Sequence, residues 1–94
     1  MKSISRDTLE EWIKQEIPFQ LLDVRSPEEH AAYNIGGLLI PLDELMRRKN
    51  EISVDLPIVC YCRKGIRSQI AIQRLQEVFP QGDFYNLIGG IGEK

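Results

Sequence analysis

The chain has 94 residues, of which 43% are hydrophobic and 28% charged, and its net charge is −2. This globular composition excludes a disordered chain and leaves room for one domain, 1–94. The charge balance offers no basic field for nucleic acid. No apolar run reaches the ~18 residues of a membrane span, and no signal peptide is expected in segment 1–7, because no apolar region follows its single lysine. Two cysteines cannot form a disulfide framework, so the sequence predicts a reduced, cytoplasmic protein.

Helix and strand character alternate from the start of the chain. Ser5 is expected to cap a helix, because Leu9, Trp12 and Ile13 follow at the spacing of one buried helical face. The mostly apolar segment 19–24 then predicts a strand.

A second helix start is marked by Ser26, Pro27 and Glu29. They have the spacing of an N-cap, a first-turn proline and the acid of a capping box. A glycine pair follows soon, so this helix is expected to end near Tyr33. His30 is expected on its exposed side as an ordinary surface residue.

The middle of the chain predicts another strand and helix. Segment 37–41 is short and apolar, as a strand would be. Leu42, Leu45 and Met46 then suggest a helix that ends in the basic run 47–49. This run is expected to be a solvated helix end, with a docking patch for an acidic partner as the alternative.

The last elements complete an alternating α/β pattern. Segment 57–61 is continuously apolar like a fully buried strand, a helix is expected from about Ser68, and 83–87 predicts the final strand. The expected buried residues of this helix are Ile70, Ala71, the stem of Arg74, Leu75 and Val78. Strands that alternate with helices imply a parallel sheet, whose carboxyl ends carry the chemistry. The segments 23–25 and 62–68 fall at such ends.

Cys62 directly follows the buried strand and begins a loop that contains Gly65. Such a loop can turn successive N–H groups inward, and a thiol that faces them and a helix N-terminus is stabilised as the thiolate. Four of the 12 basic residues and none of the 14 acidic residues lie in 56–76. These four are Arg63, Lys64, Arg67 and Arg74. The sequence therefore predicts that Cys62 is a nucleophile that attacks an anionic substrate.

Other polar and sulfur-containing residues have simpler interpretations. Cys60, inside the strand, is predicted to be a core residue, with a resolving thiol as the alternative. A metal site from Cys60, Cys62 and His30 would have too few ligands at a recognisable spacing. Asp23 and Arg25 are expected to pair and hold the turn after their strand, with a role at the cysteine loop as the alternative.

Three segments of the sequence resemble one known family. Segment 61–68 (Tyr-Cys-Arg-Lys-Gly-Ile-Arg-Ser) is similar to the active-site loop of rhodanese-like sulfurtransferases. Segment 22–29 resembles their early strand–turn–helix signature, and 86–91 resembles their final strand and Gly-Gly turn. The order and spacing of these segments match the family over about 4–91.

The resemblance implies a rhodanese-like three-layer α/β fold, in which helices flank a central parallel sheet of about five short strands. It also implies sulfur transfer through a persulfide on the catalytic Cys62, without a cofactor or a metal. The substrate-binding residues would be Arg63, Lys64, Gly65, Ile66 and Arg67. The supporting residues would be Asp23, Arg25 and Ser68.

The implied partners are sulfur compounds and their carriers. The donor would be a small anion such as thiosulfate or a persulfide, and a sulfur-carrier protein or a cysteine desulfurase could exchange sulfur with the chain. Segment 34–42 also resembles rhodanese domains fused behind the adenylyltransferases of thiamin and molybdopterin synthesis. Two departures from the family pattern stand out: Tyr33 and Asn34 replace a common Gly-His pair, and at Lys94 the expected final helix is truncated.

Two other functions are alternatives to sulfur transfer. One is a docking or regulatory module that keeps the fold without turnover. The other is a small phosphatase or arsenate reductase. The related phosphatases and arsenate reductases close a longer Cys-x5-Arg loop, whereas Arg67 follows Cys62 after only four intervening residues. The short loop therefore disfavours a tetrahedral phosphate or arsenate.

Overall fold

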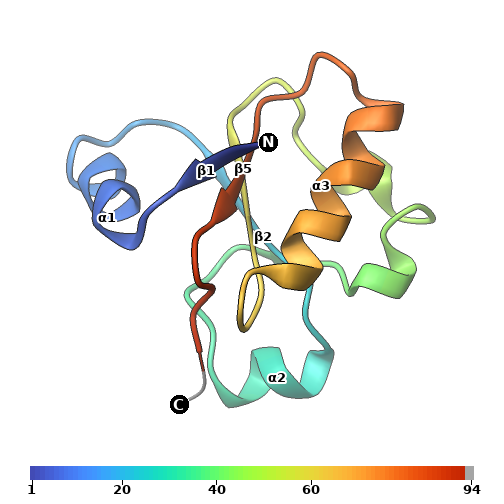
Figure 1. The fold of residues 1–94 in the computed structure, drawn as a ribbon, viewed down its shortest axis with the longest axis horizontal. Helices are drawn as coiled ribbons and strands as arrows, with labels where there is room; N and C mark the ends of the chain where they lie inside the picture. Colours follow the sequence, from blue (N-terminus) through green and yellow to red (C-terminus); the bar gives the residue numbers. More distant parts are fainter. Residues whose placement is uncertain (93–94) are drawn as a thin grey trace.

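A parallel five-stranded sheet is the centre of the computed structural model, which describes residues 1–92 (Figure 1). The strands in this described part are β1 (Lys2–Ile4), β2 (Gln20–Asp23), β3 (Leu38–Leu39), β4 (Ile58–Tyr61) and β5 (Phe84–Leu87). Their order in the sheet is β1-β5-β4-β2-β3, and all neighbours pair in parallel. This confirms the predicted α/β class with a parallel sheet of five short strands.

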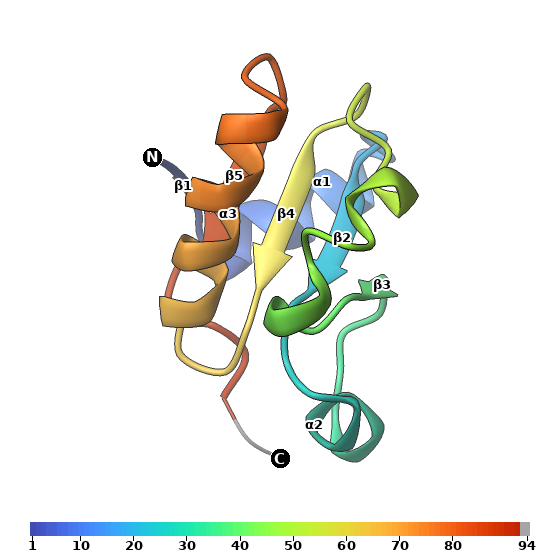
Figure 2. The same ribbon diagram turned by 90° about the vertical axis from the view of Figure 1, so that its right-hand side faces the viewer.

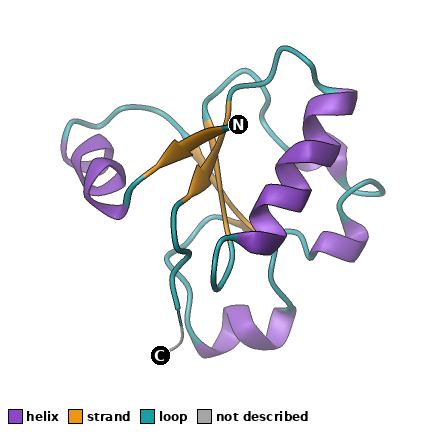
Figure 3. Cartoon of the chain, in the orientation of Figure 1, coloured by secondary structure: helices purple, strands orange, loops and turns teal. Residues whose placement is uncertain are grey.

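Helices cover both faces of the sheet (Figure 2). The helix α1 (Arg6–Lys14) lies on one face, and α3 (Ile66–Val78) lies on the other together with two 3₁₀ helices, Leu42–Glu44 and Lys49–Glu51. The short helix α2 (Pro27–Ala32) lies beyond the carboxyl ends of β2 and β4 (Figure 3). The loop after β4 reaches the same end, so α2 and the cysteine loop are neighbours.

The central strand β4 divides the core into two layers. Ile58 and Cys60 point into the layer under α3, while Val59 and Tyr61 point into the layer under α1. All four side chains are fully buried. Full burial of an apolar side chain contributes roughly 1.5–3 kcal/mol, so β4 fixes the place of the residue that follows it.

The two predicted helix caps are confirmed. The Ser5 hydroxyl accepts a hydrogen bond from the N–H of Thr8 at 3.1 Å. At the start of α2, the Ser26 hydroxyl accepts the N–H of Glu29, and the Glu29 carboxylate accepts the N–H of Ser26, each at 3.2 Å. This capping box holds the Glu29 side chain against the first turn of α2.

The helix predicted from Leu42 is wrong, because the segment forms two separate 3₁₀ turns. Only Leu45 is fully buried there, while Met46 is exposed, so no continuous helical stripe faces the core. The Arg48 guanidinium also binds Glu44, Glu51 and the carbonyl of Leu39. The bond to Leu39 joins the segment to β3. The basic run 47–49 is therefore not a helix end: Arg47 is solvated, with 73% of its side chain exposed, but Arg48 is bound within the segment.

Several boundaries and core assignments also differ from the expectation. Ile13 and Val78 were expected in the core but are 56% and 42% exposed. In α1 the contact with the sheet is made by Leu9 and Trp12, and Ile13 lies beyond it. The helix α3 begins at Ile66, two residues earlier than expected, and the strand β1 was not predicted.

Two predictions concern the ends of the chain and membranes. The family's final helix was expected to be truncated at Lys94, a residue outside those described. Within residues 1–92, every helix is too short or too polar to cross a lipid bilayer.

Candidate active site

The Cys62 side chain lies at the base of the loop between β4 and α3, where several hydrogen-bond donors converge on its sulfur. The N–H of Gly65 donates to Sγ at 3.0 Å, and the N–H of Ser68 donates at 3.4 Å. The Ser68 hydroxyl lies 3.4 Å from the same sulfur. Gly65 caps α3 with a φ of +92°, a left-handed conformation that glycine adopts without strain and that turns its N–H toward the thiol.

These donors favour the thiolate form of Cys62. Burial opposes the charge, because the side chain is only 1% exposed. The hydrogen bonds from the Ser68 hydroxyl and from the N–H groups of Ser68, Gly65 and Lys64 outweigh burial, so the pKa of Cys62 is lowered. Cys60 has the opposite environment, since complete burial and the nearby Cys62 raise its pKa. Cys62 is thus the more acidic thiol of the two.

A polar network continues from Cys62 into the sheet. The Ser68 hydroxyl donates to Oδ1 of Asn86 on β5, and Nδ2 of Asn86 donates to the carbonyl of Gly65 at 3.4 Å. The bond to Gly65 fixes which end of the Asn86 amide faces Ser68. A hydroxyl has one proton, so Ser68 donates to Asn86 when Cys62 is a thiol and can turn this proton to Sγ when Cys62 is a thiolate.

The segment after β5 holds the cysteine loop by its backbone. The N–H of Ile91 donates to the carbonyl of Cys62 at 3.0 Å, and the N–H of Gly92 donates to the carbonyl of Arg63 at 2.9 Å. Gly90 lies so close that a Cβ atom there would be 2.4 Å from the carbonyl carbon and oxygen of Arg63. The Gly-Gly turn therefore allows the close approach that braces the loop.

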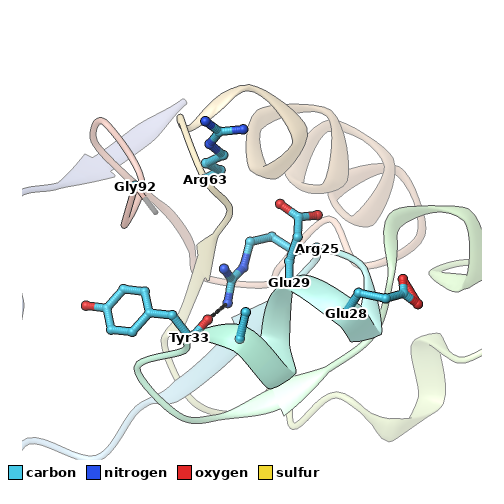
Figure 4. Close-up of a pocket in the computed structure, with 7 residues that line it drawn as sticks. Arg25, Glu28, Glu29, Tyr33, Arg63 and Gly92 are labelled. Carbon is cyan, nitrogen blue, oxygen red and sulfur yellow. Dashed lines mark hydrogen bonds between the residues drawn. The ribbon is translucent and has the colours of Figure 1, made fainter. Parts of the chain in front are cut away.

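Asp23 and Arg25 form a buried pair at the end of β2, as predicted. The Arg25 side chain is 3% exposed, and its Nε and Nη2 donate to the two carboxylate oxygens of Asp23 at 2.9 Å. Burial raises the pKa of Asp23, but the bonds from Arg25 and His30 outweigh it and lower the pKa. His30 was expected at the free surface; instead, its Nδ1 lies 2.8 Å from Asp23, because α2 lies next to the carboxyl end of β2, where Asp23 is the last residue. Arg25 also donates to the carbonyl of Tyr33, which ties down the end of α2 (Figure 4).

Four of the five residues predicted to bind substrate, all except Gly65, line a small pocket at the sulfur. This pocket has a volume of about 260 Å³, and its lining residues are Cys62, Arg63, Lys64, Ile66 and Arg67. A larger groove of about 670 Å³ lies between the cysteine loop and α2, and Arg63 lines both cavities. Figure 4 shows Arg63 on the side of this groove opposite α2.

Arg67 is already engaged within the protein. Its Nη1 and Nη2 donate to Oε1 and Oε2 of Glu29 at 2.7 and 2.8 Å. The ion pair with Arg67 lowers the pKa of Glu29 to about 2. The pair joins the first turn of α3 to the first turn of α2 across 38 residues of sequence.

Three residues of this site were not assigned by sequence reasoning. Glu29 was recognised only as a cap, His30 as a surface residue and Asn86 as part of a strand. Asn86 had a visible signal, because it is a polar residue inside the otherwise apolar strand Phe-Tyr-Asn-Leu. The pairings of Glu29 and His30 had none, since they depend on how α2 packs. Among residues 1–92, no group of three or more His, Cys, Asp or Glu side chains is placed to hold a metal ion.

A parallel α/β sheet with a cysteine loop between β4 and α3 defines a class of protein, and comparison with known proteins identifies that class. A family model described as the Rhodanese-like domain matches residues 5–93, and the chain belongs to this family. A solved structure of a rhodanese-like domain protein from Staphylococcus aureus is similar over 100% of this chain and 94% of that one, with a TM-score of 0.87 and 31% identity.

Two curated relatives contain a similar segment. The uncharacterized protein YqhL of Bacillus subtilis is 43% identical over 72 residues, which are 76% of this chain and 56% of that protein. The adenylyltransferase and sulfurtransferase MOCS3-1 of Drosophila pseudoobscura pseudoobscura is 35% identical over 85 residues, which are 82% of this chain and 19% of that protein. The chain thus spans only part of the length of both relatives.

Proposed function

We propose that the protein is a sulfurtransferase that moves sulfane sulfur from an anionic donor to a thiophilic acceptor through a persulfide on Cys62. The convergence of the Gly65 and Ser68 donors on the buried sulfur of Cys62 is the observation that supports this proposal most directly. Such donors stabilise a thiolate and would stabilise a terminal persulfide anion in the same way. The sulfurtransferase in the name of the MOCS3-1 relative agrees with this assignment.

In the first half-reaction, the Cys62 thiolate attacks the outer sulfur of thiosulfate. A bond forms between Sγ and this sulfur, the bond to the sulfonate sulfur breaks, and sulfite leaves with the electron pair. A persulfide donor would react in the same way and release a thiolate. Arg63 and Lys64 line the pocket and are proposed to attract the anion, while Gly65 and Ile66 shape the loop.

In the second half-reaction, a nucleophilic acceptor attacks the outer sulfur of the persulfide. The bond between the two sulfurs breaks, and Cys62 leaves as the thiolate that its hydrogen-bond donors stabilise. Asp23, Arg25 and Ser68 are proposed to support the loop. A sulfur-carrier protein or a desulfurase is the proposed physiological partner. A reduced, cytoplasmic setting is part of the proposal, because both cysteines are free.

The test is a single-turnover reaction followed by mass spectrometry. Incubation with thiosulfate is expected to add the mass of one sulfur atom to the protein, and cyanide is expected to remove it as thiocyanate. Cys62→Ser should abolish both steps, while the matched variant Cys60→Ser should retain them, because Cys60 lies in the core. Full transfer by Cys62→Ser would refute the mechanism. Binding of a partner protein without any turnover would point to a docking module instead.

A further inference from the structure

Glu29 is held in one place from two sides. Its Oε1 accepts hydrogen bonds from the N–H and the hydroxyl of Ser26 at 3.2 Å. From the other side, its two oxygens accept the two guanidinium N–H groups of Arg67. This bidentate pairing is the geometry in which arginine binds a carboxylate most strongly. The carboxylate is therefore a fixed part of the site and not a mobile surface acid.

The pairing changes what Arg67 can offer to a substrate. Arg67 lines the pocket of Cys62 together with Arg63 and Lys64, so three cationic side chains surround this pocket. Two N–H groups of the Arg67 guanidinium are bound by Glu29, and the Arg67–Glu29 ion pair carries no net charge. A donor anion at the sulfur consequently meets a weaker positive field than the count of basic residues suggests.

We propose that Glu29 is a specificity-determining residue: by holding Arg67, it lowers the preference of the site for dianionic sulfur donors relative to donors with a single negative charge. This inference rests on the proposed sulfur transfer. Coulomb energy scales with the charge of the ligand, so the loss of one cation penalises a dianion about twice as much as a monoanion. The chemistry favoured by the wild-type site is that of a monoanionic sulfane-sulfur donor such as an organic persulfide.

Two donors of similar shape separate the charges. Thiosulfate carries two negative charges and releases sulfite. Methanethiosulfonate carries one, and attack by the Cys62 thiolate on its outer sulfur releases methanesulfinate with the electron pair of the broken S–S bond. Both reactions leave the same persulfide on Cys62. The two donors differ in their leaving groups, but this difference cancels when the ratio of their kcat/KM values is compared between wild type and variant. The change in this ratio therefore reports how the site responds to donor charge.

The variant Glu29→Gln tests the proposal without removing the helix cap, because Gln also completes a capping box. A charge-assisted hydrogen bond from the freed Arg67 should raise kcat/KM about tenfold for thiosulfate and about threefold for methanethiosulfonate. The donor ratio then rises about threefold. Glu28→Gln is the matched control, since it removes the same charge from the next position of α2. Figure 4 shows the two carboxylates pointing in different directions.

An unchanged donor ratio in Glu29→Gln, or an equal rise in Glu28→Gln, would overturn the proposal. A fall in kcat/KM for both donors would also overturn it and would make the pair a structural brace.

A second readout does not depend on sulfur transfer. Alkylation of Cys62 by anionic iodoacetate is compared with alkylation by neutral iodoacetamide of nearly the same size. Glu29→Gln is expected to raise this ratio of rates about threefold, and Glu28→Gln should leave it near the wild-type value. If the wild-type protein transfers no sulfur while the alkylation ratio responds as expected, the proposed function fails, and what stands is that Glu29 weakens the positive field met by an anion at Cys62. An alkylation ratio that does not respond refutes the role of Glu29 alone.

Discussion

Replacement of Ser68 by Ala removes one donor from the sulfur of Cys62 and leaves the N–H donors of Gly65 and Ser68 in place. A hydrogen bond to a charged group contributes about 1.5–3 kcal/mol. The Ser68 hydroxyl lies 3.4 Å from Sγ, and it must break its hydrogen bond to Asn86 before it can donate to the thiolate. The lower end of this range therefore applies. Because ~1.4 kcal/mol corresponds to a factor of ten, the thiol–thiolate equilibrium should move about tenfold toward the thiol.

The assay is the rate of iodoacetamide alkylation measured as a function of pH, since only the thiolate reacts. In Ser68→Ala the alkylation rate should rise with pH only at a higher pH than in the wild type. At pH values where most of the Cys62 is still a thiol, the alkylation rate should be about tenfold lower. Ser68→Thr keeps a hydroxyl and should resemble the wild type, provided that circular dichroism shows the same fold. Cys60 contributes little background, because burial raises its pKa. A pH profile of Ser68→Ala that coincides with the wild type would refute the role of the hydroxyl.

Three further predictions concern the framework around the site. Gly90→Ala should displace the cysteine loop and lower the rates of Cys62 alkylation and sulfur transfer at least about tenfold. Gly89→Ala is the control and should have a much smaller effect, because Gly89 also has a positive φ but has open space around it. Asp23→Asn should lower the free energy of unfolding by about 3–5 kcal/mol, because it leaves the buried Arg25 guanidinium without its counter-charge; a loss below about 1 kcal/mol in urea titration would contradict this. Folding lowers the pKa of Glu29 from 4.5 to about 2, so its contribution is present above pH 4.5 and is lost as pH falls toward 2. Urea titrations should show Glu29→Gln less stable than wild type by about 1 kcal/mol near neutral pH, because the pair is partly exposed, and equally stable near pH 2. A difference that does not depend on pH would show that the ion pair is not its source.

Local signals in the sequence predicted a large part of the fold. Ser5 and Ser26 cap the helices that their neighbours suggested, and the apolar run around β4 became the central strand. These predictions succeeded because a capping residue bonds within its own first turn and a buried strand needs apolar residues on both faces. Both features depend on residues that are close together in the sequence.

The failures lie where distant contacts overrule a local pattern. Leu42, Leu45 and Met46 have helical spacing, yet the segment forms two separate turns, in which Leu45 alone of the three is fully buried and Arg48 donates to the carbonyl of Leu39 on β3. The strand β1 has only three residues and exists because β5, more than 80 residues later, offers a parallel edge. A short stretch of sequence reveals neither how the segment after Leu42 packs nor that β1 pairs with β5.

The sequence by itself predicted the cysteine loop as a turn whose N–H groups face one sulfur. Cys62, Gly65 and Ser68 are close neighbours along the chain, so their spacing allows the N–H groups of Gly65 and Ser68 to reach the sulfur of Cys62. Only the tertiary structure decided which partners these residues have beyond the loop. The register of β5 brings Asn86 to Ser68, and the packing of α2 brings Glu29 to Arg67. Because a charge acts through space and not along the chain, the number of basic residues near Cys62 could be counted from the sequence, whereas the charge left for a substrate could not.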